Sequence, residues 1–291
     1  MNNGHTGMKT PRVQSQIRKA IVLTVLIIQS AIFIIPLLWI FLSSFKVDME
    51  INQAGGFLYF PKTWTIGNYI SILSPGNKQL PVYNWFFNSI IVSGFQTVLA
   101  LLIYSMSAYA YGKMHFRFKN AIFLTILFLS TFPGITNIIP LYKEMYLLKW
   151  LNTPLALIVP GLSGVFNIFL IRQFLASIPN SLIESAKIDG AGEMSIFFRI
   201  IMPLIKPVLV VVGLFTFTGS WNDFLWPSIA INNLDRLTLT AGLQLAKGVY
   251  GNQVARVSTI ACISIIPMII LYLFTQKYFI KGISIQGSVK E

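Results

Sequence analysis

The feature that most constrains this chain is a series of six long apolar stretches separated by more polar segments. A helix needs about 20 predominantly apolar residues to cross the hydrocarbon core of a bilayer, because every backbone N–H and C=O must be hydrogen-bonded within the segment. The six stretches cover residues 20–42, 85–111, 121–141, 154–175, 207–227 and 257–276. The sequence therefore predicts an all-α, polytopic membrane protein with six transmembrane helices.

The composition supports this class. Hydrophobic residues make up 55% of the chain and charged residues 11%, which is too little charge for an ordinary soluble domain of 291 residues. The first stretch follows Arg18 and Lys19 but is too long for a secretory signal and lacks a small-x-small cleavage site. We expect it to be a retained anchor preceded by a polar tail, residues 1–19.

The basic residues indicate the orientation. Cytoplasmic loops of membrane proteins collect Lys and Arg. With the N-terminus inside, fourteen basic residues lie in the cytoplasm and eight on the other face. We therefore expect a multi-pass protein of the cell membrane with both tails, residues 1–19 and 277–291, in the cytoplasm. The same bias accounts for the net charge of +13 without a nucleic-acid partner.

One cytoplasmic loop, residues 178–206, has the pattern of two short helices joined by a turn. Ser181 followed by Glu184 fits a capping box that begins the first helix. Gly190 suits the left-handed conformation that ends it. The second helix, residues 193–200, would carry an apolar stripe of Ile196, Phe197 and Ile200. From spacing alone, a simple connecting loop fits equally well.

The residues of this loop also resemble a known motif. Glu184-Ser185-Ala186, Gly190 and, after nine more residues, Ile200 with Met202-Pro203 are similar to the E-A-A-x-x-x-G-x9-I-x-L-P loop of permease subunits in binding-protein-dependent ABC importers. Ser185 replaces the usual Ala, and Met202 the usual Leu. Segments 140–160, 221–227 and 277–290 resemble the carbohydrate-uptake branch, in particular the smaller membrane subunit of the maltose transporter.

The resemblance implies a division of labour. Such a permease pairs with a second permease, with two cytoplasmic ATPase subunits and with an extracytoplasmic solute-binding protein that delivers sugar or oligosaccharide cargo. The chain has no G-x-x-x-x-G-K-[ST] phosphate loop, so we expect no bound cofactor and ATP hydrolysis on another polypeptide. The residues implied in coupling to the ATPase are Glu184, Ser185, Ala186, Asp189, Gly190, Ile200, Met202 and Pro203. The C-terminal tail would reach into the ATPase dimer.

Polar and helix-breaking residues inside the spans mark a possible cargo path. The third span contains Pro133-Gly134 and Asn137, and the fourth contains Pro160-Gly161, Gly164 and Asn167. Both spans should bend there, and Asn137 and Asn167 are the candidate path residues. Close helix packing by small residues is an equally good explanation of the glycines. Trp221, Asn222 and Asp223 fall near the outer interface, where we expect a structural tie to a neighbouring loop.

Other functional classes are weaker. The two histidines, His5 and His115, lie far apart, so no metal site is expected. The outer segments 46–84, with a short helix near residues 68–73, and 228–256 would meet a binding protein or be ordinary loops. An importer of amino acids or polyamines is the alternative function, followed by a passive channel and, last, a membrane enzyme.

Overall fold

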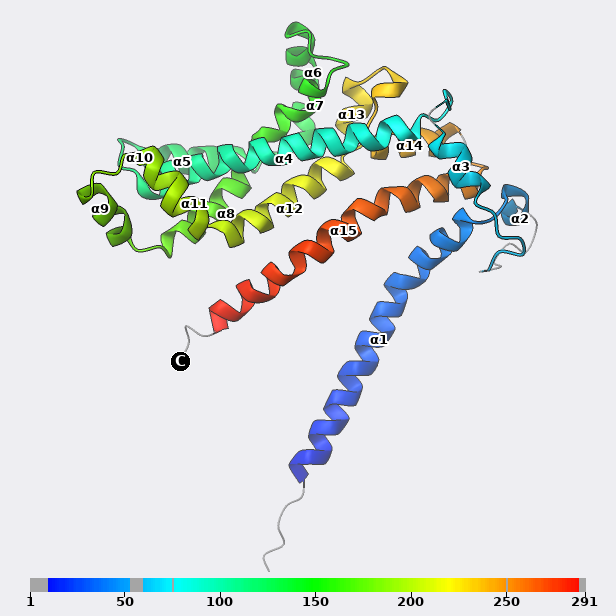
Figure 1. The fold of residues 1–291 in the computed structure, drawn as a ribbon, viewed down its shortest axis with the longest axis horizontal. Coiled ribbons are helices and arrows are strands. Elements are labelled where there is room, and N and C mark those ends of the chain that lie inside the picture. Colours follow the sequence, from blue (N-terminus) through cyan, green and yellow to red (C-terminus); the bar gives the residue numbers. More distant parts are fainter. Residues whose placement is uncertain (1–9, 53–59, 75, 250, 288–291) are drawn as a thin grey trace, which may run out of the picture. The chain divides into compact units, whose positions relative to one another are not determined.

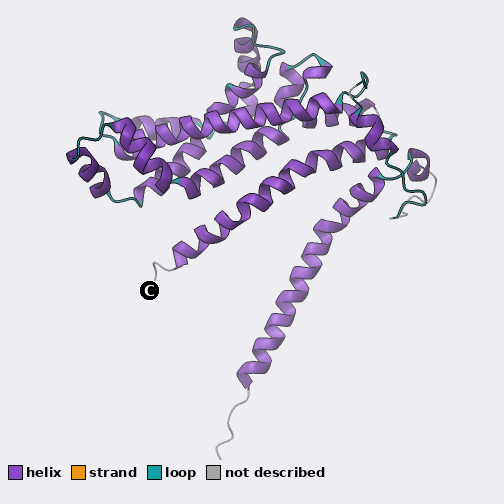
Figure 2. Cartoon of the chain, in the orientation of Figure 1, coloured by secondary structure: helices purple, strands orange, loops and turns teal. Residues whose placement is uncertain are grey.

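The computed structural model describes residues 10–52, 60–74, 76–249 and 251–287, and these residues form helices and loops without a strand (Figures 1 and 2). The helices are α1 Thr10–Ser44, α2 Asp48–Asn52, α3 Gly67–Leu73, α4 Val82–Lys113, α5 Lys119–Leu129, η1 Gly134–Asn137, α6 Ile138–Leu147, α7 Pro154–Ile158, η2 Pro160–Leu162, α8 Val165–Ala176, α9 Asn180–Ile188, α10 Glu193–Ile196, η3 Phe197–Ile201, α11 Met202–Leu204, α12 Lys206–Asn222, α13 Leu225–Ala230, η4 Leu234–Arg236, α14 Leu239–Val249 and α15 Val254–Gly287. The all-α prediction is confirmed.

Three helices are each long and apolar enough to cross a membrane, namely α1, α4 and α15. Three bent pairs bring the number of spans to as many as six. The pairs are α5 with η1 and α6, bent by 89°, α7 and η2 with α8, bent by 43°, and the α10–α11 segment with α12, bent by 80°. The first break contains Pro133, directly before η1. The second lies at Ser163-Gly164, two residues after Pro160-Gly161, so both the third and the fourth stretch bend as the sequence predicted.

Contacts divide the chain into two units, and the smaller contains residues 1–68 and 252–262. Its loops are fixed by side-chain hydrogen bonds. The Asn68 amide donates to the carbonyls of Ser44, at 3.0 Å, and Lys46, at 2.8 Å. The Asp48 carboxylate accepts from the Ala255 N–H at 2.8 Å, which satisfies one free donor in the first turn of α15.

The larger unit contains residues 69–251 and 263–291 and is organised around α4. Figure 1 shows α4 running beside α8 and α12, and both helices contact it along their length. Ala100, Tyr104 and Ala108 recur every fourth residue on α4, which places them on one face, and all three are buried. They pack with Ile171 and Leu175 of α8 in a core that continues into the loop 178–206. This loop is therefore part of the larger unit.

Several helix ends differ from the sequence predictions. Helix α1 begins at Thr10, so half of the predicted polar tail is helical, and residues 1–9 lie outside the described part. The fifth span was predicted to reach Pro227, but α12 ends at Asn222 because Asp223 is extended, with φ −68° and ψ 122°. Helix α15 continues to Gly287, through most of the predicted tail 277–291. The short helix predicted near residues 68–73 is confirmed as α3.

Candidate functional site

The first helix of the polar loop ends in a turn that requires glycine. Gly190 has φ +80°. Its N–H donates to the Lys187 carbonyl at 3.0 Å, and the Ala191 N–H donates to the Ala186 carbonyl at 2.9 Å. This pair of hydrogen bonds is the Schellman motif, in which the residue after the C-cap is left-handed. The left-handed conformation predicted for Gly190 is confirmed.

The start of that helix differs from the prediction. Helix α9 begins at Asn180, so Ser181 lies inside its first turn and the predicted capping box with Glu184 does not form. The Asn180 side chain is engaged elsewhere, because its Oδ1 accepts a hydrogen bond from Lys113 Nζ at 2.7 Å. The same ammonium donates to the Ile178 carbonyl at 2.6 Å. Lys113 of α4 therefore holds the beginning of α9.

The second helix of the loop is longer than predicted and contains a π-turn. It runs from α10 through η3, residues 197–201, to α11. Pro203 lacks an N–H and its ring would collide with the carbonyl four residues earlier, and a π-turn relieves such a conflict. The extra residue shifts the buried face: Ile196, Phe197 and Ile201 are buried, while Ile200 is only half-buried. Ile200 was predicted on the apolar stripe, and Ile201 takes that place.

A cluster of three polar side chains joins the two loop helices to α4. Lys187 of α9 and Glu193 of α10 form a salt bridge at 2.6 Å. The Tyr109 hydroxyl of α4 donates to the other Glu193 oxygen at 2.7 Å. The Lys187 ammonium, followed by the Tyr109 hydroxyl, lowers the pKa of the Glu193 carboxyl below its usual value, against a smaller opposing effect of burial. No sequence pattern predicted this cluster, although Glu193 is the acidic residue of the first turn of α10.

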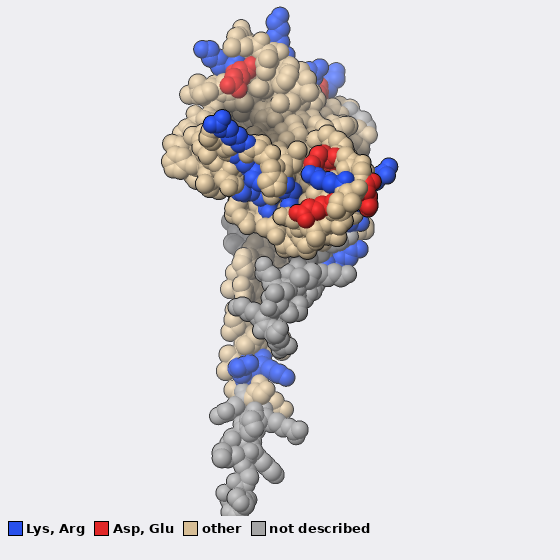
Figure 3. All heavy atoms as spheres, turned by 90° about the vertical axis from the view of Figure 1, so that its left-hand side faces the viewer, with Lys and Arg blue, Asp and Glu red and all other residues tan. Residues whose placement is uncertain are grey.

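The predicted coupling residues separate into an outward and an inward set. Glu184, Ser185, Asp189 and Gly190 are exposed, as is the neighbouring apolar side chain of Ile188, at 86%. Ala186 is buried in the core, and Ile200 and Met202 are half-buried against it, while Pro203 is exposed at the bend. Figure 3 views this end of the larger unit and shows acidic and basic side chains gathered on its surface. The loop thus presents a charged surface with exposed apolar side chains, and its inward-facing residues anchor it to the core of the larger unit.

The break in the fourth span is closed by Tyr104 of α4. Its hydroxyl donates to the Gly161 carbonyl at 2.9 Å and accepts from the Gly164 N–H at 3.0 Å. Gln96 Nε2 also donates to the Gly161 carbonyl, at 3.4 Å, while its Oε1 accepts from Ser220 of α12 at 2.8 Å. The freed backbone groups are therefore satisfied by side chains of α4, as membrane depth requires. Close packing at these two glycines is the explanation that fits the structure.

The two candidate path residues have different surroundings. Asn137 in η1 is exposed. Asn167 in α8 is half-buried, and its amide donates to Thr216 Oγ1 of α12 at 3.4 Å. Asn167 is thus part of a helix contact in this chain, whereas the Asn137 side chain is exposed.

The Trp221-Asn222-Asp223 segment holds the C-terminal end of α12. Trp221 is buried, and its Nε1 donates to the Ser264 carbonyl at 3.1 Å. The Asp223 carboxylate accepts from the Trp226 N–H at 3.3 Å, at the start of α13, and Asn222 is exposed. These contacts tie the C-terminal end of α12 to α15 and to the start of α13, and the position of this end near the outer interface stays a prediction.

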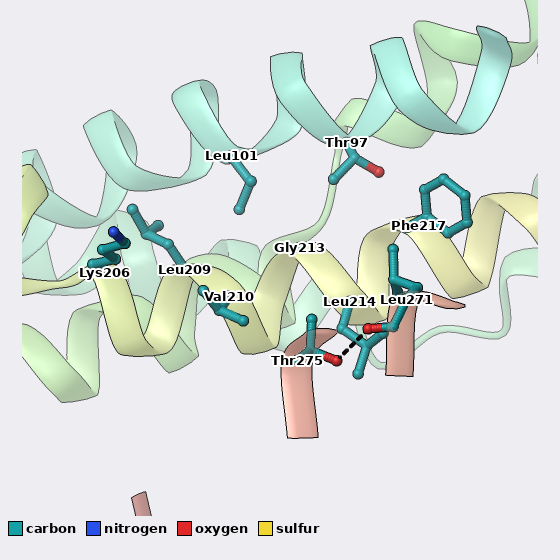
Figure 4. Close-up of a pocket in the computed structure, with 10 residues that line it drawn as sticks. All are labelled: Thr97, Leu101, Lys206, Leu209, Val210, Gly213, Leu214, Phe217, Leu271 and Thr275. Carbon is teal, nitrogen blue, oxygen red and sulfur yellow. Dashed lines mark hydrogen bonds between the residues drawn. The ribbon is translucent and has the colours of Figure 1, made fainter. Parts of the chain in front are cut away.

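A cavity of about 260 Å³ opens between α4, α12 and α15 (Figure 4). Its lining includes Leu101, Val210 and Phe217, and its two threonines direct their hydroxyls to their own helices. Thr275 Oγ1 donates to the Leu271 carbonyl at 2.8 Å, and Thr97 Oγ1 to the Ser93 carbonyl at 2.6 Å. Lys206 adds one ammonium group to an otherwise largely apolar lining, and a polyhydroxyl ligand needs several donors and acceptors, so this cavity is unsuited to one. No group of three potential metal ligands occurs among the residues that the structure describes.

A family model matches residues 111–285, a range that includes the whole polar loop. The model describes the binding-protein-dependent transport system inner membrane component. Among curated proteins, the arabinooligosaccharides transport system permease protein AraQ of Halalkalibacterium halodurans is 35% identical over 257 residues, which cover 88% of this chain and 91% of the relative. The diacetylchitobiose uptake system permease protein NgcG of Streptomyces coelicolor is 30% identical over 269 residues, which cover 91% and 87% of the two chains.

Solved structures extend the likeness to the fold. A chain of a bacterial ABC transporter involved in the import of the acidic polysaccharide alginate matches with a TM-score of 0.79 and 25% identity, over 94% of this chain and 100% of the other. A second chain, from the alginate transporter in complex with its alginate pentasaccharide-bound periplasmic protein, matches with a TM-score of 0.64 and 14% identity. The second likeness concerns the fold alone.

Proposed function

This chain belongs to the family of binding-protein-dependent transport system inner membrane components, and from that premise we propose that it forms half of the translocation path of an ATP-driven importer for a sugar or oligosaccharide. It is a multi-pass membrane protein and a transport subunit, not an enzyme. The cargo class rests on its relatives, which are named for arabinooligosaccharides and diacetylchitobiose. These names do not favour the alternative cargoes, amino acids and polyamines.

The observation that carries the coupling role is the combination of an exposed tip and a fixed base in loop 178–206. Glu184 and Asp189 are exposed, and Ile188 is 86% exposed. Behind them, Ile183 and Ala186 are buried in the same core as the spans. A protruding helix pair of this kind can transmit force between a soluble subunit and the membrane helices. We assign the seat of the ATPase subunit to this surface.

The proposed assembly contains a second permease, two ATPase subunits and a solute-binding protein. The cavity between α4, α12 and α15 is lined mainly by apolar side chains, and the proposed cargo path is shared with a second permease. The basic residues favour both termini in the cytoplasm. In that orientation α3 and α14 face outward, where a binding protein would dock.

Reconstitution tests the function. Proteoliposomes that hold this chain, a second permease and the ATPase subunits should take up oligosaccharide only with ATP and the loaded binding protein. A catalytically inactive ATPase subunit should abolish uptake. Continued uptake with that subunit would contradict an ATP-driven importer and favour a passive channel. Uptake of amino acids in place of oligosaccharides would contradict the cargo class.

A further inference from the structure

Tyr109 connects the polar loop to the membrane helices through two different contacts. Its hydroxyl donates to Glu193 at 2.7 Å, and its ring lies against Phe197 with the ring centroids 5.7 Å apart. Tyr109 and Phe197 are 5% and 2% exposed, so both rings are held in the core. Tyr109 therefore binds the second loop helix through one hydrogen bond and one contact between aromatic rings.

The same end of α4 also holds the first loop helix. Lys113, one turn beyond Tyr109, donates to the Ile178 carbonyl and to Asn180 Oδ1. The Lys187–Glu193 salt bridge then joins the two loop helices to each other across the turn at Gly190. The Schellman turn at Gly190 sets the direction in which the chain leaves α9, and these side-chain contacts hold the second loop helix against α4 and α9.

We propose that Tyr109, Glu193 and Lys187 form a positioning cluster that makes the loop move together with α4, so that displacement of the loop by an ATPase subunit is transmitted to α4. This inference rests on the proposed function and names the helix that receives the force. The three residues act on the orientation of the loop and do not touch cargo. Tyr109 is buried behind the exposed surface of Glu184 and Asp189, so its hydroxyl can be removed without altering that surface.

The substitution Tyr109→Phe removes the hydroxyl and keeps the ring on Phe197. Tyr111→Phe is the matched control, since Tyr111 lies on the same helix and its ring contacts Phe116 and Phe123. Among the described residues its hydroxyl has no hydrogen-bond partner. In the reconstituted importer, Tyr109→Phe should retain the ATPase subunits but reduce the number of cargo molecules moved per ATP hydrolysed by roughly tenfold or more, as expected for a lost hydrogen bond to a charged group. Tyr111→Phe should leave this ratio unchanged.

A charge swap separates positioning from general stability. Glu193→Lys and Lys187→Glu should each reduce the transport ratio, and the double variant should recover part of it. The restored pair again bridges the helices, and the Tyr109 hydroxyl can accept from the new ammonium. A purely structural contribution would not be restored by exchanging the charges, because the environment of each charge differs. Failure of the double variant to exceed both single variants would overturn the cluster.

A distance measurement gives a second readout that does not depend on transport. Spin labels at His115→Cys, just after α4, and Ile188→Cys, at the loop tip, report the angle of the loop to α4, with Cys262→Ala removing the native thiol. Both sites are exposed. The distance distribution should broaden in Tyr109→Phe and not in Tyr111→Phe. The inference fails, and the proposed function stands, if the wild-type importer couples ATP hydrolysis to uptake and Tyr109→Phe has the same number of cargo molecules per ATP and the same distance distribution as the wild type. If the wild-type complex shows no ATP-driven uptake, the proposed function itself fails.

Discussion

The hydroxyl of Tyr104 accepts a hydrogen bond from the backbone N–H of Gly164 at 3.0 Å, and this contact leaves no room for a side chain at position 164. A Cβ atom there would lie 2.4 Å from the hydroxyl oxygen and 2.5 Å from the ring carbon that carries it. Tyr104 is 1% exposed and cannot move aside. The break in the fourth span is thus shaped to fit one tyrosine of α4.

We expect Gly164→Ala to destabilise the purified permease. Overpacking in a buried contact costs about 1–3 kcal/mol, and the loss of the Tyr104 hydrogen bond adds to it. The melting temperature in detergent, followed by tryptophan fluorescence, should fall by several degrees, roughly as this free energy requires. Gly94→Ala on α4 is the control, because nothing lies within 4 Å of its added Cβ and alanine favours a helix. Equal melting temperatures for the two variants would contradict the proposed fit.

Sequence patterns revealed the features that depend on neighbours in the chain. The length of the apolar stretches predicted the spans, the Pro-Gly pairs predicted the bent third and fourth spans, and Gly190 predicted its left-handed turn. Each follows from local rules for backbone hydrogen bonds and allowed dihedral angles. The extended Asp223, which ends α12 five residues early relative to the prediction, has no comparable local signal.

Contacts between residues that are far apart in the chain could not be predicted from sequence patterns. Tyr109 and Glu193 are 84 residues apart, so their hydrogen bond becomes visible only when α4 and the loop are packed together. The burial of Ile201 in place of the predicted Ile200 was also not predictable from the sequence. It depends on a π-turn that a regular helical period does not anticipate.

The proposed orientation predicts which side of the membrane exposes the loop tip. In a chain with Cys262→Ala, a thiol at Ile188→Cys should react with a membrane-impermeant maleimide only in inside-out vesicles. A thiol at Lys78→Cys, on the exposed segment before α4, should react only in right-side-out preparations, that is, intact cells whose cell wall has been removed. The physical reason is the concentration of Lys and Arg in the cytoplasmic segments. Labelling of both sites from the same side would contradict the topology.

The Glu193 cluster should respond to acid and not to pH near neutrality. The pKa of this carboxyl is lowered in the folded protein, so its contribution to stability is fully present above the ordinary glutamate value of about 4.3 and is lost as the pH falls through the lower folded value. The ratio of transport by wild type to transport by Glu193→Gln should therefore be flat from about pH 6 to 8. A ratio that changes strongly within this window would show that another titrating group controls the cluster.

The turn at Gly190 offers the sharpest test of the loop, because a second glycine two residues away has an ordinary backbone. Gly190 has φ +80°, whereas Gly192 has φ −74° and ψ 160°, and nothing lies within 4 Å of an added Cβ at either position. A side chain therefore meets no steric obstacle in either case. The two positions differ in backbone conformation, which for a β-branched residue in the left-handed region costs on the order of 1 kcal/mol or more.

We expect Gly190→Val to reach the membrane at normal levels, since the strain falls on the loop and not on the spans. The variant should then bind the ATPase subunits poorly and show little stimulation of ATP hydrolysis by loaded binding protein, because α9 can no longer end in its Schellman turn. Gly192→Val should assemble and hydrolyse ATP as the wild type does. Co-purification of the ATPase subunits and the stimulated hydrolysis rate measure both outcomes. Equal assembly and stimulation for the two variants would mean that the bend at Gly190 is not needed for coupling and that loop 178–206 only connects two spans.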